Sequence, residues 1–464
     1  MRLPYSKEKT QDKIYIIRKV KMKNKDSKIL KTIMAVVLFA AMMISMAACG
    51  TQDTAEAVTE ETVQEQTIDQ ETTVNTANVT SDGAIDASGI FTERDLEQTA
   101  DLTDAQYFTL SDGQDIEITE AGVYVITGTA KNVTVTVDAA DDDKVQIVLN
   151  GANVTNDSDP VIYVKNADKV FVTTADTENS LKVTGEFQAD GDTNTDAVIY
   201  SKDDLVINGV GTLNIESSDN GISGKDDIKI TGGTLNITSE GDAVEANDSI
   251  AVADGNITIS TNKDGMHAEN DEDNTAGYIY ICGGTFRIDA ADDGIQATTI
   301  LQIDGGEFDI NAAEGIEGTY VQINDGTISI NATDDGINGS QKSTAVNVQI
   351  EINGGDISVS MGQGDTDAVD VNGSLTITGG TLNIIAQSPF DIDGTVTFSG
   401  GTVIENGQEV SQITNSMMGG KMGGPGGQMG GMPGQGGHGG FGGQGPQGGM
   451  GSQPDFSGQN GQQG

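Results

Sequence analysis

Tryptophan is absent from this 464-residue sequence, and aromatic residues together make up only 4% of it. Only two cysteines are present, so a framework of disulfide bonds is excluded, and we expect Cys282, in an apolar stretch, to be buried and inert. Basic residues are scarce as well: 24 Lys and Arg stand against 71 Asp and Glu, and the formal net charge is −47. Such a surface repels nucleic acid and attracts cations, so we exclude nucleic acid as a partner.

Much of the scarce positive charge lies near the N-terminus, ahead of an apolar run at residues 33–44. Basic residues followed by a short apolar run and small residues are typical of a secretory signal, and the run is short for a membrane span. The sequence SMAACG at residues 45–50 resembles a bacterial lipobox, in which Cys49 becomes the lipidated first residue. We expect an anchor at the extracellular face of the cell membrane, with the membrane contacted through this lipid alone. The alternative is an ordinary signal peptide and a secreted protein.

Composition divides the chain into four segments. Residues 1–48 form the expected signal peptide, with Met22 as its expected true start. Residues 49–105 hold the lipidated cysteine and a spacer rich in Thr, Glu, Gln and Asp, which is predicted to be flexible. Residues 106–414 carry the repeats of the folded domain, and residues 415–464 form a Gly-, Met- and Gln-rich tail predicted to be disordered.

A repeat within residues 106–414 indicates the fold. Apolar and polar residues alternate on both sides of a glycine-containing turn, and this period of two predicts short strands. A second short pattern follows each turn: an acidic residue, a small residue, a branched apolar residue, a polar residue, then Ala or Gly, as in DGIQA at 293–297. Aligned on the turn, the units recur at Gly211, Gly233, Gly255, Gly284, Gly306, Gly326, Gly355, Gly380 and Gly401.

Three short strands and three bends in roughly 22 residues amount to one coil of a solenoid. We therefore predict an all-β fold, a right-handed parallel β-helix with an N-terminal cap, in which inward Ile, Leu, Val and Phe form one continuous core. A propeller or a sandwich would need a longer repeat or longer strands. We expect a monomer.

Four longer stretches resemble a known family. They are VQIVLNG at 145–151, IYVKNADK at 162–169, IYSKDDL at 199–205 and SGKDD at 223–227. They are similar to the calcium- and carbohydrate-binding β-helix lipoproteins of Gram-positive anaerobes, and the likeness covers roughly residues 110–404. The resemblance implies a pectate-lyase-like fold, binding of cellulose and acidic pectic sugars with calcium, and no established catalysis. It does not identify the residues that contact sugar.

Stacking of coils converts repeated acidic positions into acidic columns. Carboxylates about 5 Å apart repel by roughly 1 kcal/mol in water and 3–4 kcal/mol at an effective dielectric constant of 20. Because lysine is scarce, we expect Ca²⁺ to fill the columns, with a solvated acidic face as the alternative. Zinc is not expected, because His267 has no second histidine outside the tail. The predicted calcium ligands are Asp242, Glu245, Asp264, Asp293, Glu314, Glu317, Asp335, Asp365, Asp367 and Asp370.

Three functions stay open. The first is polysaccharide binding at the cell surface through calcium bridges. The second is a calcium-dependent lyase or a hydrolase acting on polygalacturonate, with Arg287 as the candidate base and a structural pair with Asp309 as the alternative reading of that arginine. The third is a structural adhesin or spacer. Without tryptophan, an aromatic sugar platform would need outward-facing tyrosines, for which the candidates are Tyr163, Tyr200, Tyr278, Tyr280 and Tyr320.

Overall fold

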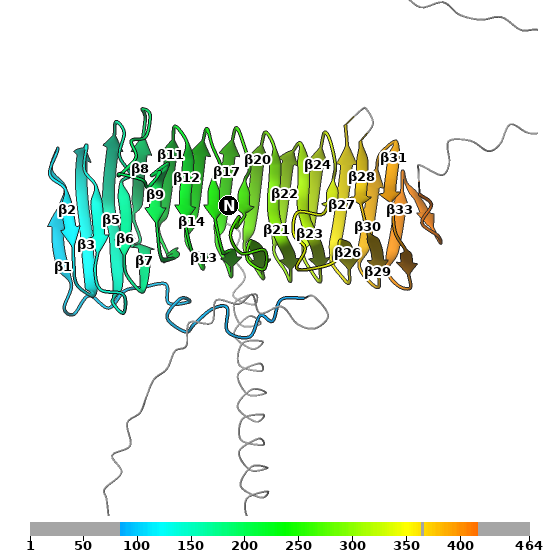
Figure 1. Ribbon diagram of the computed structural model, residues 1–464, viewed down its shortest axis with the longest axis horizontal. Coiled ribbons are helices and arrows are strands. Elements are labelled where there is room, and N and C mark those ends of the chain that lie inside the picture. Colours follow the sequence, from blue (N-terminus) through cyan, green and yellow to red (C-terminus); the bar gives the residue numbers. More distant parts are fainter. Residues whose placement is uncertain (1–83, 363–365, 416–464) are drawn as a thin grey trace, which may run out of the picture. The chain divides into compact units, whose positions relative to one another are not determined.

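The structure, a computed structural model, describes residues 84–362 and 366–415. These residues form 34 strands, and no helix occurs among them. The strands stack into three parallel sheets, which we name A, B and C in the order in which the chain visits them within a coil. Figure 1 shows the coils succeeding one another along a single axis. The predicted parallel β-helix is confirmed.

Sheet A has one strand from each coil. Its members are β1 (Gln106–Thr109), the first part of β3 (Gly122–Lys131), the first part of β5 (Lys144–Asn156), β7 (Lys169–Thr174), β10 (Asp204–Gly209), β13 (Asp227–Ile230), β16 (Ser249–Val252), β19 (Tyr278–Ile281), the second part of β21 (Asp293–Ile303), the second part of β23 (Glu314–Ile323), β26 (Gln349–Ile352), β29 (Ser374–Ile377) and β32 (Val396–Phe398).

Sheet B follows the glycine turn of each coil. Its members are the second parts of β3 and β5, then β8 (Glu178–Val183), β11 (Thr212–Ser217), β14 (Thr234–Ser239), β17 (Asn256–Thr261), β20 (Thr285–Ala290), β22 (Glu307–Ala312), β24 (Thr327–Ala332), β27 (Asp356–Met361), β30 (Thr381–Ile385) and β33 (Thr402–Glu405). The last strand, β34 (Gln408–Val410), pairs antiparallel with β33.

Sheet C contains the strands that begin at the second sequence pattern. Its members are β2 (Ile116–Ile118), β4 (Val135–Asp138), β6 (Ile162–Asn166), β9 (Ala197–Ser201), β12 (Asn220–Gly224), β15 (Val244–Ala246), β18 (Met266–Ala268), the first parts of β21 and β23, β25 (Ile337–Gly339), β28 (Asp367–Val371) and β31 (Ser388–Ile392).

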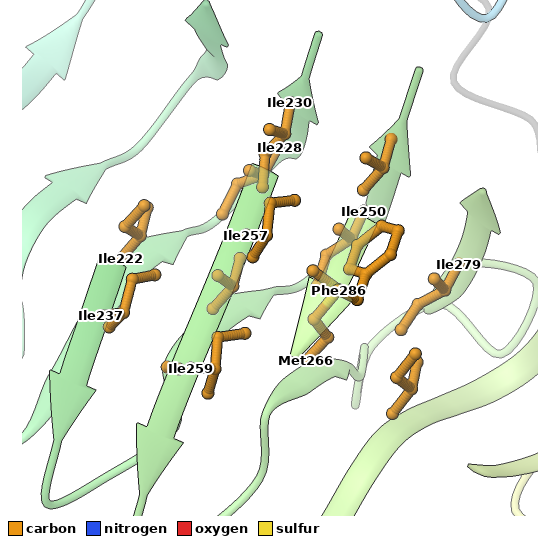
Figure 2. Close-up of a cluster of buried hydrophobic side chains, with 14 of the residues drawn as sticks. Ile222, Ile228, Ile230, Ile237, Ile250, Ile257, Ile259, Met266, Ile279 and Phe286 are labelled. Carbon is orange, nitrogen blue, oxygen red and sulfur yellow. The ribbon is translucent and has the colours of Figure 1, made fainter. Parts of the chain in front are cut away.

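The core is a ladder of inward apolar side chains from all three sheets. Ile228, Ile250 and Ile279 occupy equivalent positions in successive coils of sheet A and are fully buried. Figure 2 shows them beside Ile257 and Phe286, which are paired in sheet B. Burying one such side chain contributes roughly 1.5–3 kcal/mol, so repetition along the axis supplies the stability that disulfides do not.

The turn between sheets A and B requires glycine at defined positions. Gly306 has a φ of +121°, and a Cβ there would lie 2.9 Å from the Phe308 ring. Equivalent glycines with positive φ occur in each coil from Gly233 to Gly401, as the alignment predicts. The first predicted unit differs, because the positive φ falls on Gly209 rather than on Gly211.

Two longer connections lie on the same side of the β-helix, both between sheet C and sheet A. They follow β18 and β25, and they meet where Asn274 donates a hydrogen bond from Nδ2 to Thr344 Oγ1 at 2.9 Å. At the other end of β19, Cys282 is exposed, so the expectation of a buried cysteine is wrong. No helix in the described ranges is long and apolar enough to cross a bilayer.

The segment 84–98 packs against the outer face of sheet A, and the prediction of a flexible spacer up to residue 105 is wrong for this part. Ile85 and Ile90 are buried against Tyr280 and Tyr320. The Ile85 amide donates to Gln302 Oε1 at 2.7 Å, and Gln98 Nε2 donates to the Thr231 carbonyl at 3.0 Å. Composition missed this contact because two isoleucines and a few polar anchors are enough to fix the segment.

Candidate metal-binding column

The outer face of sheet C aligns one side chain per coil, as predicted. Glu245 pairs in register with His267, which pairs with Gln296, and Gln296 pairs with Glu317. The ladder continues through Asn338 to Asp370. Coil stacking therefore brings residues far apart in sequence into one column. At its end the register places Asp391 beside Asp370.

A second column lies at the bend before sheet C. The backbone amide of Asp264 donates to Asp242 Oδ1 at 3.1 Å, and that of Asp293 donates to Asp264 Oδ1 at 2.9 Å. The Asp367 amide donates to Asp335 Oδ1 at 3.2 Å in the same way. One oxygen of each of these carboxylates thus accepts a hydrogen bond from the backbone of the next coil. The other oxygen of Asp242 and of Asp264 lies 3.5 Å from His267 Nδ1 of the first column.

The two columns together form groups of side chains whose potential ligand atoms lie within 4.8 Å of one another. Asp242, Asp264 and His267 form one such group, which we name the histidine nest. Asp293, Glu314 and Glu317 form another, the carboxylate nest. Asp264 and Asp293 also group with Asp292, which was not predicted.

The carboxylate nest holds three acidic groups at the edge of the protein interior. Asp293 and Glu317 are each only 4% exposed. Burial, followed by repulsion from Glu314, raises the pKa of Asp293 to about 8, and burial is also the main cause that raises the pKa of Glu314 to about 7. A proton or a cation is therefore needed there at neutral pH.

Polar neighbours donate hydrogen bonds to some of the oxygen atoms of the carboxylate nest. Gln296 Nε2 donates to Glu317 Oε2 at 2.8 Å and also to Asp293. Asn338 Nδ2 donates to Glu314 Oε2 at 2.8 Å, and Lys342 Nζ lies 2.7 Å from Glu317 Oε2. The nest thus offers several oxygens, of the kind that Ca²⁺ prefers, with one lysine at its margin.

The histidine nest has cationic neighbours of its own. Lys263 Nζ lies 2.8 Å from Asp242 Oδ2, and His267 Nδ1 lies 3.5 Å from the same oxygen. Burial alone would raise the pKa of Asp242, but His267 and Lys263 outweigh it and lower that pKa. Burial raises the pKa of Asp264 to about 6. Lysine is therefore not too scarce to serve the columns, contrary to expectation, because Lys263 and Lys342 both reach them.

The remaining predicted ligands are more dispersed. The Glu245 carboxylate accepts hydrogen bonds from Asn220 Nδ2 at 2.9 Å and Ser223 Oγ at 3.0 Å, outside either nest. Asp335, Asp367 and Asp370 are half-buried towards the C-terminal coils, and burial raises the pKa of Asp335 and of Asp370 to about 6. The predicted ligand Asp365 and the lipidation site Cys49 lie outside the described residues.

A further acidic group, which was not predicted, lies at the bend between sheets C and A. Asp204, Asp226 and Asp227 gather there, with Asp227 raised in pKa to about 6 by burial and by Asp204. The signal was the repeated Asp pair at 203–204 and 226–227, one coil apart.

Arg287 lies on the outer face of sheet B, away from the sheet C columns. Its side chain is 71% exposed, and Nη2 lies 3.7 Å from Asp309 Oδ2, which is its partner in the next coil. Both residues line a groove with Thr258 and Glu307. The structure thus contains the Arg287–Asp309 pair, and none of the acidic groups described above includes a sheet B residue.

The five candidate tyrosines do not form an open platform. Tyr280 and Tyr320 point away from the core but are covered by the segment 84–98, with Tyr278 packed partly buried beside them. Tyr163 and Tyr200 pack edge to face, with ring centroids 5.8 Å apart, and are likewise buried. These tyrosines therefore offer no accessible sugar platform, because outward direction does not ensure exposure.

This architecture, a long solenoid of parallel strands with acidic groups stacked at its turns, defines the molecule as a parallel β-helix. The chain belongs to the carbohydrate-binding domain-containing protein family, whose profile matches residues 112–388 and 312–416. The family expected from the sequence is confirmed.

Two individual proteins are similar to this chain. A carbohydrate-binding domain-containing protein of Acetivibrio thermocellus is 35% identical over 123 residues, which are 26% of this chain and 43% of the relative. The match therefore spans less than half of that relative. A solved structure, described as a polysaccharide lyase-like protein from C. thermocellum in a gadolinium derivative, is 29% identical with a TM-score of 0.44. That match covers 46% of this chain and 92% of the solved one.

Proposed function

We propose that this protein is a cell-surface lipoprotein that binds plant-type polysaccharide, acidic pectic sugars or cellulose, with Ca²⁺ held by the stacked acidic turns. Membership of a carbohydrate-binding family supports the class of partner. The carboxylate nest is the observation that carries the calcium part, since two of its carboxyl groups have pKa values of about 8 and about 7 without an ion. Its oxygen donors suit a hard cation.

Calcium gives this acidic protein a means of binding an acidic polymer. A formal charge of −47 repels uronate chains, and the chain has few Lys and Arg to contact them. A calcium ion coordinated by the nest and by a sugar carboxylate would reverse the local sign. Asp292 and Asp334 are exposed beside the nest, so the sugar would approach the ion over this rim.

Retention on insoluble polygalacturonate and on cellulose, in calcium and then in EGTA, tests the proposal. We expect retention in calcium, release by EGTA, and loss of the calcium-dependent part in a Glu314→Gln/Glu317→Gln variant. Glu307→Gln is the matched control, because Glu307 is an exposed glutamate on sheet B. Absence of retention in every condition would contradict binding and leave the structural adhesin. Release of unsaturated oligosaccharides would instead establish the lyase.

The lipid anchor is tested separately. A Cys49→Ala variant should move from the membrane fraction to the medium or to the soluble fraction of the cell envelope. Metabolic labelling with a fatty acid should mark the native chain and not the variant. Equal labelling of both chains would contradict lipidation at Cys49.

A further inference from the structure

The histidine nest differs from the carboxylate nest in one donor. Neither ring nitrogen of His267 makes a hydrogen bond, although the residue is only 8% exposed. Its Nδ1 lies 3.5 Å from Asp242 Oδ2 and 3.5 Å from Asp264 Oδ2. A buried imidazole without hydrogen bonds is unfavourable unless something else engages its nitrogens.

These separations match the edges of a metal coordination polyhedron. Bonds of roughly 2.0–2.2 Å in a tetrahedral site place neighbouring ligand atoms about 3.3–3.6 Å apart. His267 Nδ1 lies at this ligand–ligand spacing from both aspartate oxygens, and the ligand atoms of all three residues lie within 4.8 Å of one another, so that they can share one ion. Asp242 Oδ1 and Asp264 Oδ1 keep their backbone hydrogen bonds, so both Oδ2 atoms are oriented towards that point.

We propose that the histidine nest binds a divalent transition-metal ion such as zinc, with Asp242, Asp264 and His267 Nδ1 as ligands and water completing the shell. Calcium takes oxygen ligands, whereas imidazole suits zinc, nickel, copper and iron. The nitrogen donor thus separates this site from the oxygen-only carboxylate nest further along the same columns. A second histidine is not needed, because two aspartates supply the other protein ligands.

Two further residues fit such a site. Glu269 Oε2 lies 3.4 Å from His267 Nε2, where a carboxylate can orient the ring and increase its basicity as a ligand. Lys263 Nζ, 2.8 Å from Asp242 Oδ2, places a positive charge at the same oxygen. The Lys263 side chain is 52% exposed, so it can turn into solvent when an ion enters. Lys263 is then a competitor of the metal, and its removal should increase affinity.

Titration of the full chain, without an affinity tag, with Co²⁺ tests the proposal by visible absorption. We expect one equivalent to give the intense bands of tetrahedral cobalt and zinc to displace it. His267→Gln should weaken this binding at least tenfold, since losing an outer partner of a ligand already costs roughly 10–100-fold. Gln is a conservative choice, because Gln296 occupies the equivalent position in the next coil. Lys263→Met should tighten binding several-fold.

His438→Gln, which removes the other histidine of the chain, is the matched control and should leave the cobalt spectrum unchanged. Circular dichroism establishes that the variants keep the β-fold. Cobalt binding that survives His267→Gln unchanged would overturn the proposal, as would displacement of cobalt by equimolar calcium or unaltered affinity in Lys263→Met. These readouts do not involve polysaccharide, so they are independent of the proposed carbohydrate function.

Discussion

Asp95 and Asp293 are both almost completely buried, at 0% and 4% exposed, but the charges around them differ in sign. Asp95 lies 3.7 Å from Lys169 Nζ and 3.9 Å from Lys229 Nζ, two lysines that point outward from sheet A. Asp293 faces Glu314 and Glu317 instead, and its pKa rises to about 8. One aspartate is neutralised by the chain, and the other needs a proton or a cation from solution.

The difference separates a structural carboxylate from one that is available to a ligand. Desolvating an ion costs several kcal/mol, and a protein offsets this only with well-placed opposite charge. At Asp95 the opposite charge comes from lysine side chains of sheet A, so the contact holds the segment 84–98 in place. At the carboxylate nest the opposite charge is incomplete, since among the residues that the structure describes only Lys342 forms an ion pair with it, and binding of an ion is coupled to stability there.

The largest predicted effect comes from removing the charge of Asp95, the carboxylate that the chain itself neutralises. Asp95→Asn should leave Lys169 and Lys229, with side chains 11% and 10% exposed, without their buried partner. Breaking a buried pair from one side costs about 3–5 kcal/mol, and we expect the lower end because Asp204 still lies 3.2 Å from Lys169 Nζ. Urea denaturation measures the loss.

Glu97→Gln is the control for this variant, because Glu97 is exposed in the same segment. It should change the free energy of unfolding by less than about 0.5 kcal/mol. Limited proteolysis should cleave the segment 84–98 faster in Asp95→Asn than in the control. Equal stability of the two variants would show that the lysines do not depend on Asp95.

Next in size is the gain in stability that we expect when calcium binds at the carboxylate nest. An ion present at 100 times its dissociation constant stabilises the folded state by about 2.7 kcal/mol, which raises Tm by roughly 4 °C for a domain of this size. Thermal unfolding in calcium and in EGTA measures the shift. Asp95→Asn should retain it, whereas Glu314→Gln/Glu317→Gln should lose it. A Tm indifferent to EGTA would contradict the calcium assignment.

The surroundings of Asp293 belong to the repeat and were predictable from the sequence, because local alternation and the glycine turn fix the register of each coil. Gln296 and Glu317 could be placed side by side by counting residues alone, and the structure pairs them. The carboxylate nest follows from that register, so its three members were all among the predicted ligands. The β-helix is a fold in which sequence spacing translates almost directly into spatial proximity.

The surroundings of Asp95 were not predictable in this way. Thr231, which donates a hydrogen bond to the Asp95 carbonyl, lies 136 residues further along the chain, and no repeat relates the two. Lys263 and Lys342 reach the columns from bends and loops, whose paths depend on backbone details that the repeat does not specify. The sequence alone presents His267 as a lone histidine, because the carboxylates around it come from two different coils.

A smaller effect is the response of stability to pH in EGTA. The pKa of Asp293 is about 8 and that of Glu314 about 7 in the folded protein, above their usual values near 4, so between roughly pH 4 and pH 8 the folded state binds more protons than the unfolded chain. Stability contributed by these groups is therefore lost as pH rises through this window. The raised pKa of His267 acts in the same direction, against the opposing effect of its burial.

Urea denaturation at pH 5 and at pH 8 measures this slope. We expect lower stability at pH 8 in EGTA, a much smaller difference in calcium, and a flatter slope in an Asp293→Asn/Glu314→Gln variant. The lowered pKa of Asp242 does not disturb the test, because its contribution is lost only below about pH 4. Stability that rises with pH in EGTA would contradict the account of the nest.

The smallest predicted effect concerns a pair that is not buried. Arg287 and Asp309 have side chains 71% and 49% exposed, so water solvates each charge whether or not the other is present. Arg287→Ala should change stability by less than about 1 kcal/mol, in contrast to Asp95→Asn. The same variant should keep calcium-dependent retention on polygalacturonate, because Arg287 lies on sheet B and the nest on the sheet C side. Desolvation makes the surrounding charge decisive only for buried groups, so it predicts a small effect for Arg287→Ala. A large loss of stability in this variant would mean that the contrast between Asp95 and Asp293 has a cause other than desolvation.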